Sequence, residues 1–153
     1  NDKGGAVFMK RRTADIEYEQ TLHSRYTIAQ HRAEDGLDRS VYLLMSRING
    51  QGPMSIGELS VAFRLDVSTV QRQTTVALRE GLLERILDPA GSAARKLTLS
   101  DLGRARLTAA REHPVDALDR ILADWPTDEV NTFADLMHRF IVSIEEYRES
   151  RAG

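Results

Sequence analysis

The sequence predicts a mainly α-helical domain with one small β-hairpin, and three features between residues 55 and 99 support this prediction. Residues 55–58 read Ser-Ile-Gly-Glu, a capping box in which the serine and glutamate side chains satisfy free backbone N–H groups at a helix start. A second box, residues 68–71, opens a helix that runs to Gly81, a residue suited to the left-handed end of a helix. Two short segments, 82–87 and 95–99, then flank the turn-rich run 88–94. Two helices at a tight turn, followed by a two-stranded wing, predict a winged helix-turn-helix, which can place a helix in a DNA groove.

Two helices are expected ahead of this motif. Apolar residues recur at roughly helical spacing between residues 13 and 32, and Gly36 ends the pattern. Asp38 can cap the next helix, which the run 50–53, Gly-Gln-Gly-Pro, brings to an end. The apolar residues of this second helix have the spacing of a stripe that faces a core; they are Val41, Leu44, Met45 and Ile48.

The helix expected over residues 68–81 has two faces of different chemistry. At about 100° per residue, Val70, Thr74, Ala77 and Leu78 cluster on one side and pack inward. The opposite side has no acidic residue, whereas an ordinary solvated face, the alternative interpretation, usually includes acids that form local ion pairs. Arg and Gln side chains match guanine and adenine edges, and Ser and Thr suit phosphates. We therefore expect this side to contact DNA through Ser68, Thr69, Gln71, Arg72, Gln73, Thr75 and Arg79.

A terminal helix with a long apolar seam is expected after the motif. Ser100 starts a helix that should run to about Trp125, with a disturbance at Pro114 where a backbone donor is missing. In the helix after Thr127, apolar residues recur in steps of three and four, which suits packing against another helix along its whole length. The alternative is that this seam packs on the chain's own core, although a small winged helix already has one. We expect a homodimer formed by this helix with those over 13–32 and 101–125, and the interface candidates are Ile16, Val130, Phe133, Met137, Phe140, Ile144 and Tyr147.

Several of these segments together resemble the MarR family of winged-helix transcriptional regulators. The resemblance rests on residues 65–70 (Leu-Asp-Val-Ser-Thr-Val), residues 78–85 (Leu-Arg-Glu-Gly-Leu-Leu-Glu-Arg), Asp88-Pro89, and residues 97–100 (Leu-Thr-Leu-Ser) with Gly103. It covers nearly the whole chain, because the length and the helices on both sides match as well. The resemblance implies a recognition helix, an Asp-Pro wing and a dimer built by the flanking helices.

The wing departs from the family pattern. Relatives usually have an Asp-Arg-Arg run just after the Asp-Pro, and one arginine can then enter the minor groove. This chain has Gly91, Ser92 and Ala93 at those positions. Arg95 and Lys96 lie close by, at the start of the return strand, and are the candidates to replace that contact. This departure removes the basis in the family pattern for expecting a minor-groove contact and a salt bridge within the wing.

Length and composition fit one domain of an ordinary globular protein. The chain has 153 residues and no cysteine, which excludes disulfides and thiol chemistry, including the peroxide-sensing branch of the resembled family. Residues 1–10 are expected to be a disordered leader, and residues 11–153 one domain with a DNA-binding part at about 38–100 and dimerisation helices at about 13–32 and 101–149. No apolar run approaches the roughly 20 residues that span a bilayer. We therefore expect no membrane partner and a cytoplasmic location.

The net charge of −2 conceals an uneven distribution. Residues 64–106 contain eight basic and five acidic residues, whereas residues 112–149 contain ten acidic and three basic residues. A polyanion is therefore attracted to the middle of the chain and repelled by its C-terminal part.

The sequence offers little support for metal binding or catalysis. His23 and His31 lie eight residues apart, but no histidine pair has one-turn spacing with carboxylate or thiolate partners. A phosphate-binding glycine loop, a Gly-x-Ser-x-Gly motif and a cysteine nucleophile are all missing. We expect no enzyme activity and no cofactor. By analogy of position, polar and aromatic residues of the first two helices are candidates for binding a small molecule, with core and surface roles as the alternative: His23, Tyr26, His31, Arg39 and Tyr42.

These observations favour a mainly α fold with a small β-hairpin wing, a winged helix-turn-helix flanked by N- and C-terminal dimerisation helices. The expected function is that of a dimeric, sequence-specific DNA-binding transcriptional regulator, a ligand-responsive repressor that binds a palindromic double-stranded operator. The alternative is a winged-helix module that binds another protein and no DNA. The acid-free face with its small hydroxyls disfavours this alternative, because protein interfaces prefer aromatic anchors.

Overall fold

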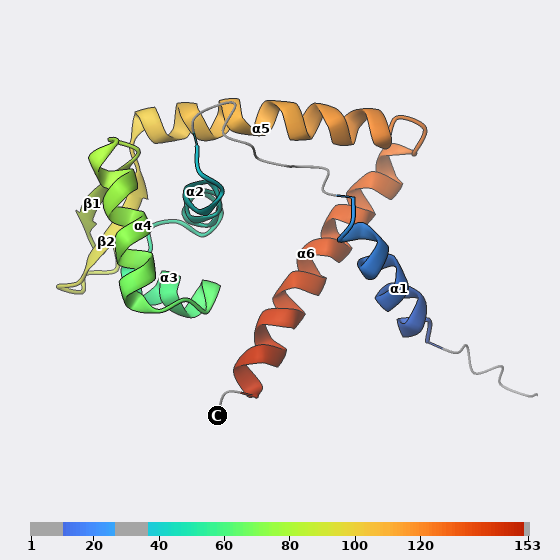
Figure 1. Cartoon of the computed structure of the whole chain (residues 1–153), viewed down its shortest axis with the longest axis horizontal. Helices are drawn as coiled ribbons and strands as arrows, with labels where there is room; N and C mark the ends of the chain where they lie inside the picture. The colour runs from blue at the N-terminus through green and yellow to red at the C-terminus, as the bar shows by residue number, and fades with distance from the viewer. Residues whose placement is uncertain (1–10, 27–36, 152–153) are drawn as a thin grey trace, which may run out of the picture. The chain divides into compact units, whose positions relative to one another are not determined.

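The computed structural model describes residues 11–26 and 37–151, and the chain divides into two compact units, residues 1–30 and 31–153 (Figure 1). The expected leader, residues 1–10, lies outside the described residues. The described part of the first unit contains one helix, α1 (Thr13–His23), whose residues are exposed except for the half-buried Leu22. The expected helix over 13–32 is wrong in its extent. Helix α1 ends at His23, and the N–H of Ser24 bonds to the carbonyl of Gln20.

The second unit contains the predicted winged helix-turn-helix. Its elements follow in the order α2 (Arg39–Gln51), α3 (Ile56–Phe63), α4 (Val67–Arg79), β1 (Leu83–Leu87), β2 (Arg95–Leu99), α5 (Asp101–Ile121) and α6 (Thr127–Ser150) (Figure 1). Helices α3 and α4 form the helix-turn-helix, and the antiparallel pair β1–β2 forms the wing. The predicted fold class is therefore confirmed.

The helix starts follow the capping residues in three of four cases. Asp38 accepts from the N–H of Ser40 at α2, and both halves of the capping box of Ser55 and Glu58 are formed at α3. The predicted box at residues 68–71 is wrong, because α4 begins at Val67 with Asp66 as its N-cap. The chain turns at Arg64, which has the left-handed conformation (φ 51°). Two residues later, the carbonyl of Asp66 accepts the first hydrogen bonds of α4, from the N–H groups of Thr69 and Val70.

The core of the second unit lies where α2 packs on α4 and on the inner face of the hairpin. The predicted stripe of α2 is buried, and so is the predicted inner face of α4 except for the half-buried Leu78, which fixes the opposite face of α4 outward. Strand residues complete the core from the wing side, because alternate side chains of a strand point to the same face. The fully buried members include Leu44, Met45, Ile48, Leu59, Val70, Thr74 and Leu99.

The wing is attached to the helix-turn-helix by a third backbone segment. Strands β1 and β2 pair from Leu83 opposite Leu99 to Leu87 opposite Arg95. Met54, just before α3, bridges to Leu97, and the two residues exchange N–H to carbonyl bonds of 3.1 and 2.8 Å. No sequence pattern predicts this bridge, because one residue of extended backbone has no periodic signal.

Helix α5 begins at a close contact with the start of the hairpin. Ser100 accepts from the N–H of Gly103 at 2.9 Å and donates from its hydroxyl to the carbonyl of Gly81. A Cβ added at Gly103 would lie 2.0 Å from the carbonyl oxygen of Leu82. Only glycine permits this approach between α5 and the chain entering β1.

Helices α5 and α6 leave the core and meet at a turn. Helix α5 ends at Ile121 and not at the expected Trp125, because Leu122 caps it by donating to Leu118, and the chain then turns toward Pro126. The helix continues through Pro114 without interruption. Helix α6 extends over 24 residues and has no buried residue. In the described residues, no helix is both long and apolar enough to cross a lipid bilayer.

We predict that Gly103→Ala lowers the free energy of unfolding by more than about 2 kcal/mol, because a rigid backbone atom occupies the space of the new methyl group. Gly50→Ala in α2 is the matched control, since nothing lies within 4 Å of its added Cβ. This control should leave stability unchanged or raise it by up to about 1 kcal/mol. Urea unfolding of both variants tests this, and equal stability of the two would contradict the close contact.

Candidate nucleic-acid interface

The outward face of α4 presents polar side chains and no carboxylate. Ser68, Gln71, Arg72, Thr75 and Arg79 are exposed. Neither Arg72 nor Arg79 forms a hydrogen bond or ion pair with other described residues, so both guanidinium groups are available to a ligand. The hydroxyl of Thr75 donates to the carbonyl of Gln71 at 2.7 Å, and its oxygen can still accept a hydrogen bond.

Two other candidates on α4 lie toward its edges. Thr69 and Gln73 are half-buried. Gln73 lines a small hollow with Ser40 and Leu43 of α2 and with Leu65, so its side chain lies on the α2 side of the helix. The pattern of buried and exposed residues on α4 otherwise follows the predicted two faces.

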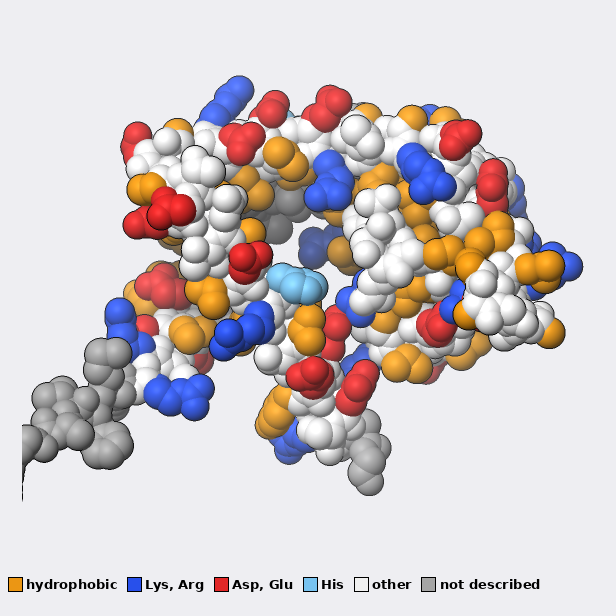
Figure 2. Space-filling model, turned by 180° about the vertical axis from the view of Figure 1, so that it is seen from behind, with side chains coloured by type: hydrophobic (Ala, Val, Ile, Leu, Met, Phe, Trp, Pro, Cys, Tyr) orange, Lys and Arg blue, Asp and Glu red, His pale blue; other side chains and the backbone are white. Residues whose placement is uncertain are grey.

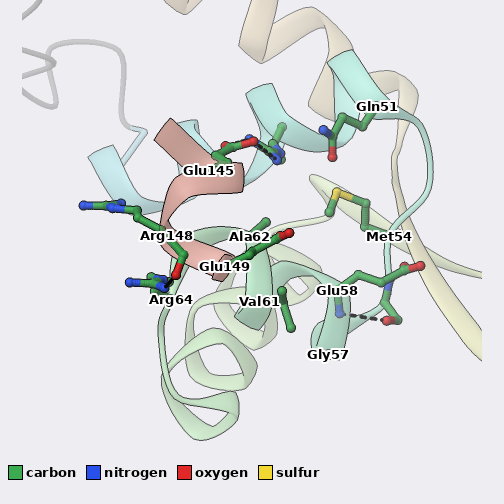
Figure 3. A pocket seen from close by; sticks show the side chains of 12 residues that line it. Gln51, Met54, Gly57, Glu58, Val61, Ala62, Arg64, Glu145, Arg148 and Glu149 are labelled. Atoms are coloured by element: carbon green, nitrogen blue, oxygen red, sulfur yellow. Dashed lines mark hydrogen bonds and ion pairs between the residues drawn. The ribbon is translucent and has the colours of Figure 1, made fainter. Parts of the chain in front are cut away.

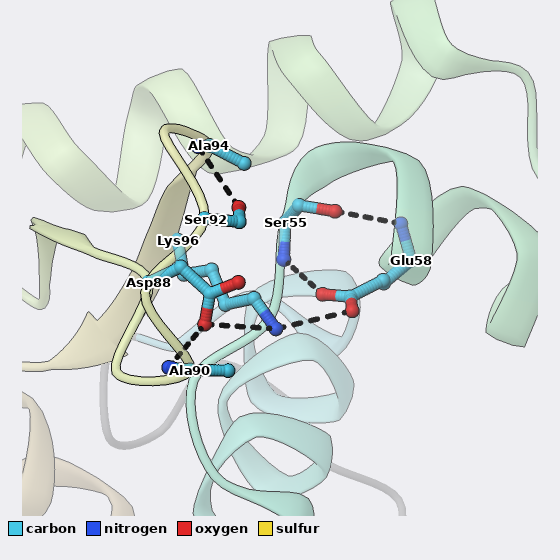
Figure 4. Close-up of polar contacts among 7 residues, drawn as sticks. All are labelled: Ser55, Glu58, Asp88, Ala90, Ser92, Ala94 and Lys96. Carbon is cyan, nitrogen blue, oxygen red and sulfur yellow. Dashed lines mark hydrogen bonds and ion pairs between the residues drawn. The ribbon is translucent and has the colours of Figure 1, made fainter.

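The tip of the wing is closed by short polar side chains (Figure 4). Asp88 Oδ1 accepts from the N–H of Ala90 at 2.9 Å, and Ser92 Oγ accepts from the N–H of Ala94 at 3.0 Å. Gly91 has φ +88°, a conformation that glycine adopts without strain. The tip is therefore shaped by its own backbone and carries no cation.

Lys96 forms ion pairs at the base of the wing. Its ammonium lies 3.2 Å from Glu58 Oε1 and 3.6 Å from Asp88 Oδ1, and its side chain is only 18% exposed (Figure 4). Glu58 belongs to the capping box of α3, so this lysine connects the helix-turn-helix to the wing. Sequence analysis grouped Lys96 with the DNA-contacting candidates, whereas its neighbours give it a structural role. Arg95 is exposed and stays available at the start of β2.

The three charged groups of this cluster stabilise one another in their ionised forms. The N–H of Ser55 and then the Lys96 ammonium hold the pKa of Glu58 below its ordinary value. The N–H of Ala90 holds the pKa of Asp88 low, with further contributions from Ser92 and Lys96. The hydrogen bond to Glu58 and the charge of Asp88 raise the pKa of Lys96. The cluster is therefore fully charged at neutral pH.

The apolar seam of α6 is open to solvent. Phe133, Met137 and Tyr147 are exposed, whereas Val130, Phe140 and Ile144 are half-buried. Near the turn between α5 and α6, the rings of Trp125 and Phe133 lie 5.8 Å apart. Ile16, the candidate on α1, is also exposed.

The apolar surface of α5 and α6 is wider than the predicted seam. Figure 2 shows hydrophobic side chains along both helices and acidic side chains around the turn that joins them. Large exposed apolar residues beyond the seam include Val115, Leu118, Ile121, Leu136, Ile141 and Val142. On α6, Leu136 and Ile141 flank the seam, whereas Val142 lies on the opposite side of the helix.

The small-molecule candidates do not form one site within either unit. His23 and Tyr26 are exposed in the first unit, Arg39 is exposed and Tyr42 half-buried on α2 of the second, and His31 lies outside the described residues. In the described ranges 11–26 and 37–151, no group of three metal-ligating side chains comes together.

A cavity that no sequence pattern predicts lies among α2, α3 and the C-terminal end of α6 (Figure 3). Its volume is about 500 Å³, and its lining includes Arg47, Val61, Arg64, Glu145 and Arg148. Residues about a hundred positions apart meet there, which no local pattern predicts. Arg39 and Tyr42, the candidates described in this unit, do not line it.

Comparisons with known proteins agree with this architecture. An uncharacterized HTH-type transcriptional regulator of Bacillus subtilis (strain 168), YxaD, is 32% identical over 127 residues, which cover 81% of this chain and 89% of that protein. A MarR family protein from Bacillus stearothermophilus superposes with a TM-score of 0.68 at 18% identity, covering 89% of this chain and 98% of that one. A MarR family regulator from Rhodococcus sp. RHA1 gives 0.64 at 18% identity, covering 86% and 97%. No family model matches the chain.

We predict that Lys96→Met loosens the wing while the core stays folded, because the apolar stem is kept and the ammonium is lost. Amide hydrogen exchange should speed up in residues 83–99 and stay unchanged in α2. Arg95→Met, at the exposed neighbouring position, is the control and should leave exchange in the hairpin unaltered.

The same cluster predicts a pH dependence. The lowered pKa values of Glu58 and Asp88 mean that the cluster stabilises the wing above the ordinary carboxylate pKa of about 4 and loses this effect as pH falls through the lowered values. The raised pKa of Lys96 means that the effect is also lost at high pH, as pH rises through the raised value. The difference between wild type and Lys96→Met should therefore disappear in acid. A difference that persists there would contradict the ionic origin.

Proposed function

Because the chain belongs to the MarR family of helix-turn-helix transcriptional regulators, we propose that it is a homodimeric repressor that reads a palindromic operator and is released by a small molecule. The relatives named above are bacterial, so we propose that it acts in the cytoplasm, where the DNA of such organisms lies. The observation that carries the proposal is the outward face of α4, which combines two available guanidinium groups with hydroxyl and amide side chains and has no carboxylate.

Base reading is assigned to Arg72, and the remaining residues of the face assist it. A guanidinium can bond to both O6 and N7 of guanine, and the glutamine amide can pair with adenine. Arg72 lies near the middle of α4 and is exposed, whereas Ser68 at the helix start suits a phosphate. A rigid helix backed by the buried core presents these groups to a major groove in fixed register.

Near its tip, the wing contributes the cation of Arg95 under this proposal. Arg95 is exposed at the start of β2, while Lys96 is neutralised by two carboxylates. One available positive charge near the tip supports shallow contact with the phosphate backbone or minor groove. Specificity then rests mostly on α4.

The dimer is assigned to the apolar surface of α5 and α6. A 24-residue helix without a buried residue is costly to leave in water, since apolar surface is stabilised by burial. A contiguous apolar face of this kind marks an interaction site. In a twofold dimer, two copies of α4 can meet half-sites about one helical turn, or roughly 34 Å, apart.

Release by an effector requires a difference in affinity. A small molecule shifts the population only if it binds one arrangement of the two recognition helices more tightly than the other. The candidates for such binding remain His23, Tyr26, His31, Arg39 and Tyr42.

We predict that Arg72→Ala weakens binding to the specific duplex by about 1–3 kcal/mol, the scale of a good bidentate base contact, and weakens non-specific binding much less. The duplex is first selected from a random pool by the wild-type protein, and binding is then titrated at several salt concentrations. Arg95→Ala is the control, and it should weaken all sequences alike and reduce the salt slope by about one. If Arg72→Ala also weakens all sequences equally, this residue contacts only phosphate. If the wild type selects no duplex, the chain is a protein-interaction module instead.

We predict that Phe140→Asp converts the dimer to a monomer or unfolds the chain, because an unpaired charge in an apolar interface is costly. Asn131→Asp introduces the same charge on an exposed position of α6, on the side away from the seam, and should remain dimeric. Sedimentation equilibrium measures the mass, and circular dichroism reports folding. A folded dimer of Phe140→Asp would refute the proposed interface.

A further inference from the structure

The C-terminal half of α6 contacts α2 and the C-cap of α3 through one polar contact each (Figure 3). Arg47 of α2 donates two hydrogen bonds to Glu145 of α6, from Nη1 to Oε1 at 2.6 Å and from Nη2 to Oε2 at 3.2 Å. Arg64, the C-cap of α3, donates from Nη2 to the backbone carbonyl of Arg148. The first contact joins residues 98 positions apart, so it fixes the tertiary arrangement and no local structure.

These two contacts help to hold the end of α6, where Ile144 is only half-buried. The helix has no buried residue, and a cavity of about 500 Å³ separates its end from α3. The ion pair itself is partly shielded, with the side chains of Arg47 and Glu145 only 22% and 32% exposed. A bidentate pair at such a position has a defined geometry that a surface pair lacks. This pair therefore helps to set the position of the end of α6.

Arg47, one member of the pair, lies on α2, which packs against the recognition helix α4. Arg47 lies between Met45 and Ile48, which are buried in the core that α2 shares with α4. Arg64 lies in the turn between α3 and α4. A displacement of α6 relative to either arginine is thus a displacement relative to α4, because close-packed helices move together.

Glu145, the other member of the pair, lies on α6, the helix that carries the apolar seam. Glu145 follows the seam residue Ile144, about 100° further round the helix, so it lies on a flank of α6 and not in the seam itself. One unbroken helix carries both features from Thr127 to Ser150. Fixing the seam against a partner therefore fixes the carboxylate that Arg47 binds.

We propose that the Arg47–Glu145 ion pair positions α4 relative to the dimer seam and so determines which half-site spacing the dimer accepts. Arg47 and Glu145 are positioning residues, since neither has to touch DNA for this effect. The inference rests on the dimer and on the base reading of the proposed function, and it adds the element that couples the two.

The test measures affinity as a function of half-site spacing. The half-site is the one recovered from a random pool with wild-type protein, and it is placed twice in duplexes whose separation varies in single base-pair steps. Binding is compared among wild type, Glu145→Gln, Arg47→Gln, the double variant, and the charge swap of Arg47→Glu with Glu145→Arg. Glu146→Gln is the matched control, because it makes the same change one residue away on an exposed position.

We expect wild type and Glu146→Gln to share one sharp spacing optimum. Glu145→Gln and Arg47→Gln should lose about twofold to thirtyfold at this optimum, the range for residues that modulate coupling between sites, and should accept neighbouring spacings more evenly. The double variant should lose no more than either single variant, and the charge swap should restore part of the preference. Affinity for a duplex with one half-site, and the dimer mass in sedimentation, should remain unchanged.

A spacing profile of Glu145→Gln that matches Glu146→Gln would overturn the inference while leaving the dimer and base reading intact. A weaker single half-site affinity in Glu145→Gln would overturn it too, since the pair would then act on folding or on DNA directly. Failure of the proposed function is distinguishable, because the wild type itself would then bind no duplex or sediment as a monomer.

Discussion

Burial of one face of α4 against α2 is the interaction on which the other features depend. Val70, Thr74 and Ala77 lie in the core with the apolar stripe of α2, and this leaves a single direction for the opposite face. Side chains that contact a base need an orientation fixed to a fraction of an ångström. A buried helix face supplies that rigidity at positions where the contacting residues themselves have no structural partner.

The same unit joins the wing and α6 to this core by charges and backbone contacts. The Met54–Leu97 bridge and the Lys96 cluster attach the hairpin to α3, and Arg47 attaches α6 to α2. Such contacts specify geometry more than they add stability, because desolvation offsets much of the attraction between paired charges. The molecule therefore combines a packed centre with two attachments in which ion pairs take part.

The contacts of the wing show how its departure from the family pattern is accommodated in the structure. The tip has no arginine, and the lysine that sequence analysis offered as a substitute is held between Glu58 and Asp88. The same contacts supply a salt bridge within the wing, which the altered tip sequence had called into question. A wing fixed in this way presents its shape and, near its tip, the exposed cation of Arg95, and we propose that specificity rests mostly on α4.

The sequence by itself determined the fold class, the start of α2 and α3, the two faces of α4 and the apolar seam of α6. Each of these depends on local spacing or on a cap within four residues, and such signals are complete in a short window. Tertiary structure decided the start of α4, the partners of Lys96, the close approach at Gly103, and the cavity and ion pair at the end of α6. These depend on residues that are distant in the chain and become neighbours only after the core has formed, so no periodicity encodes them.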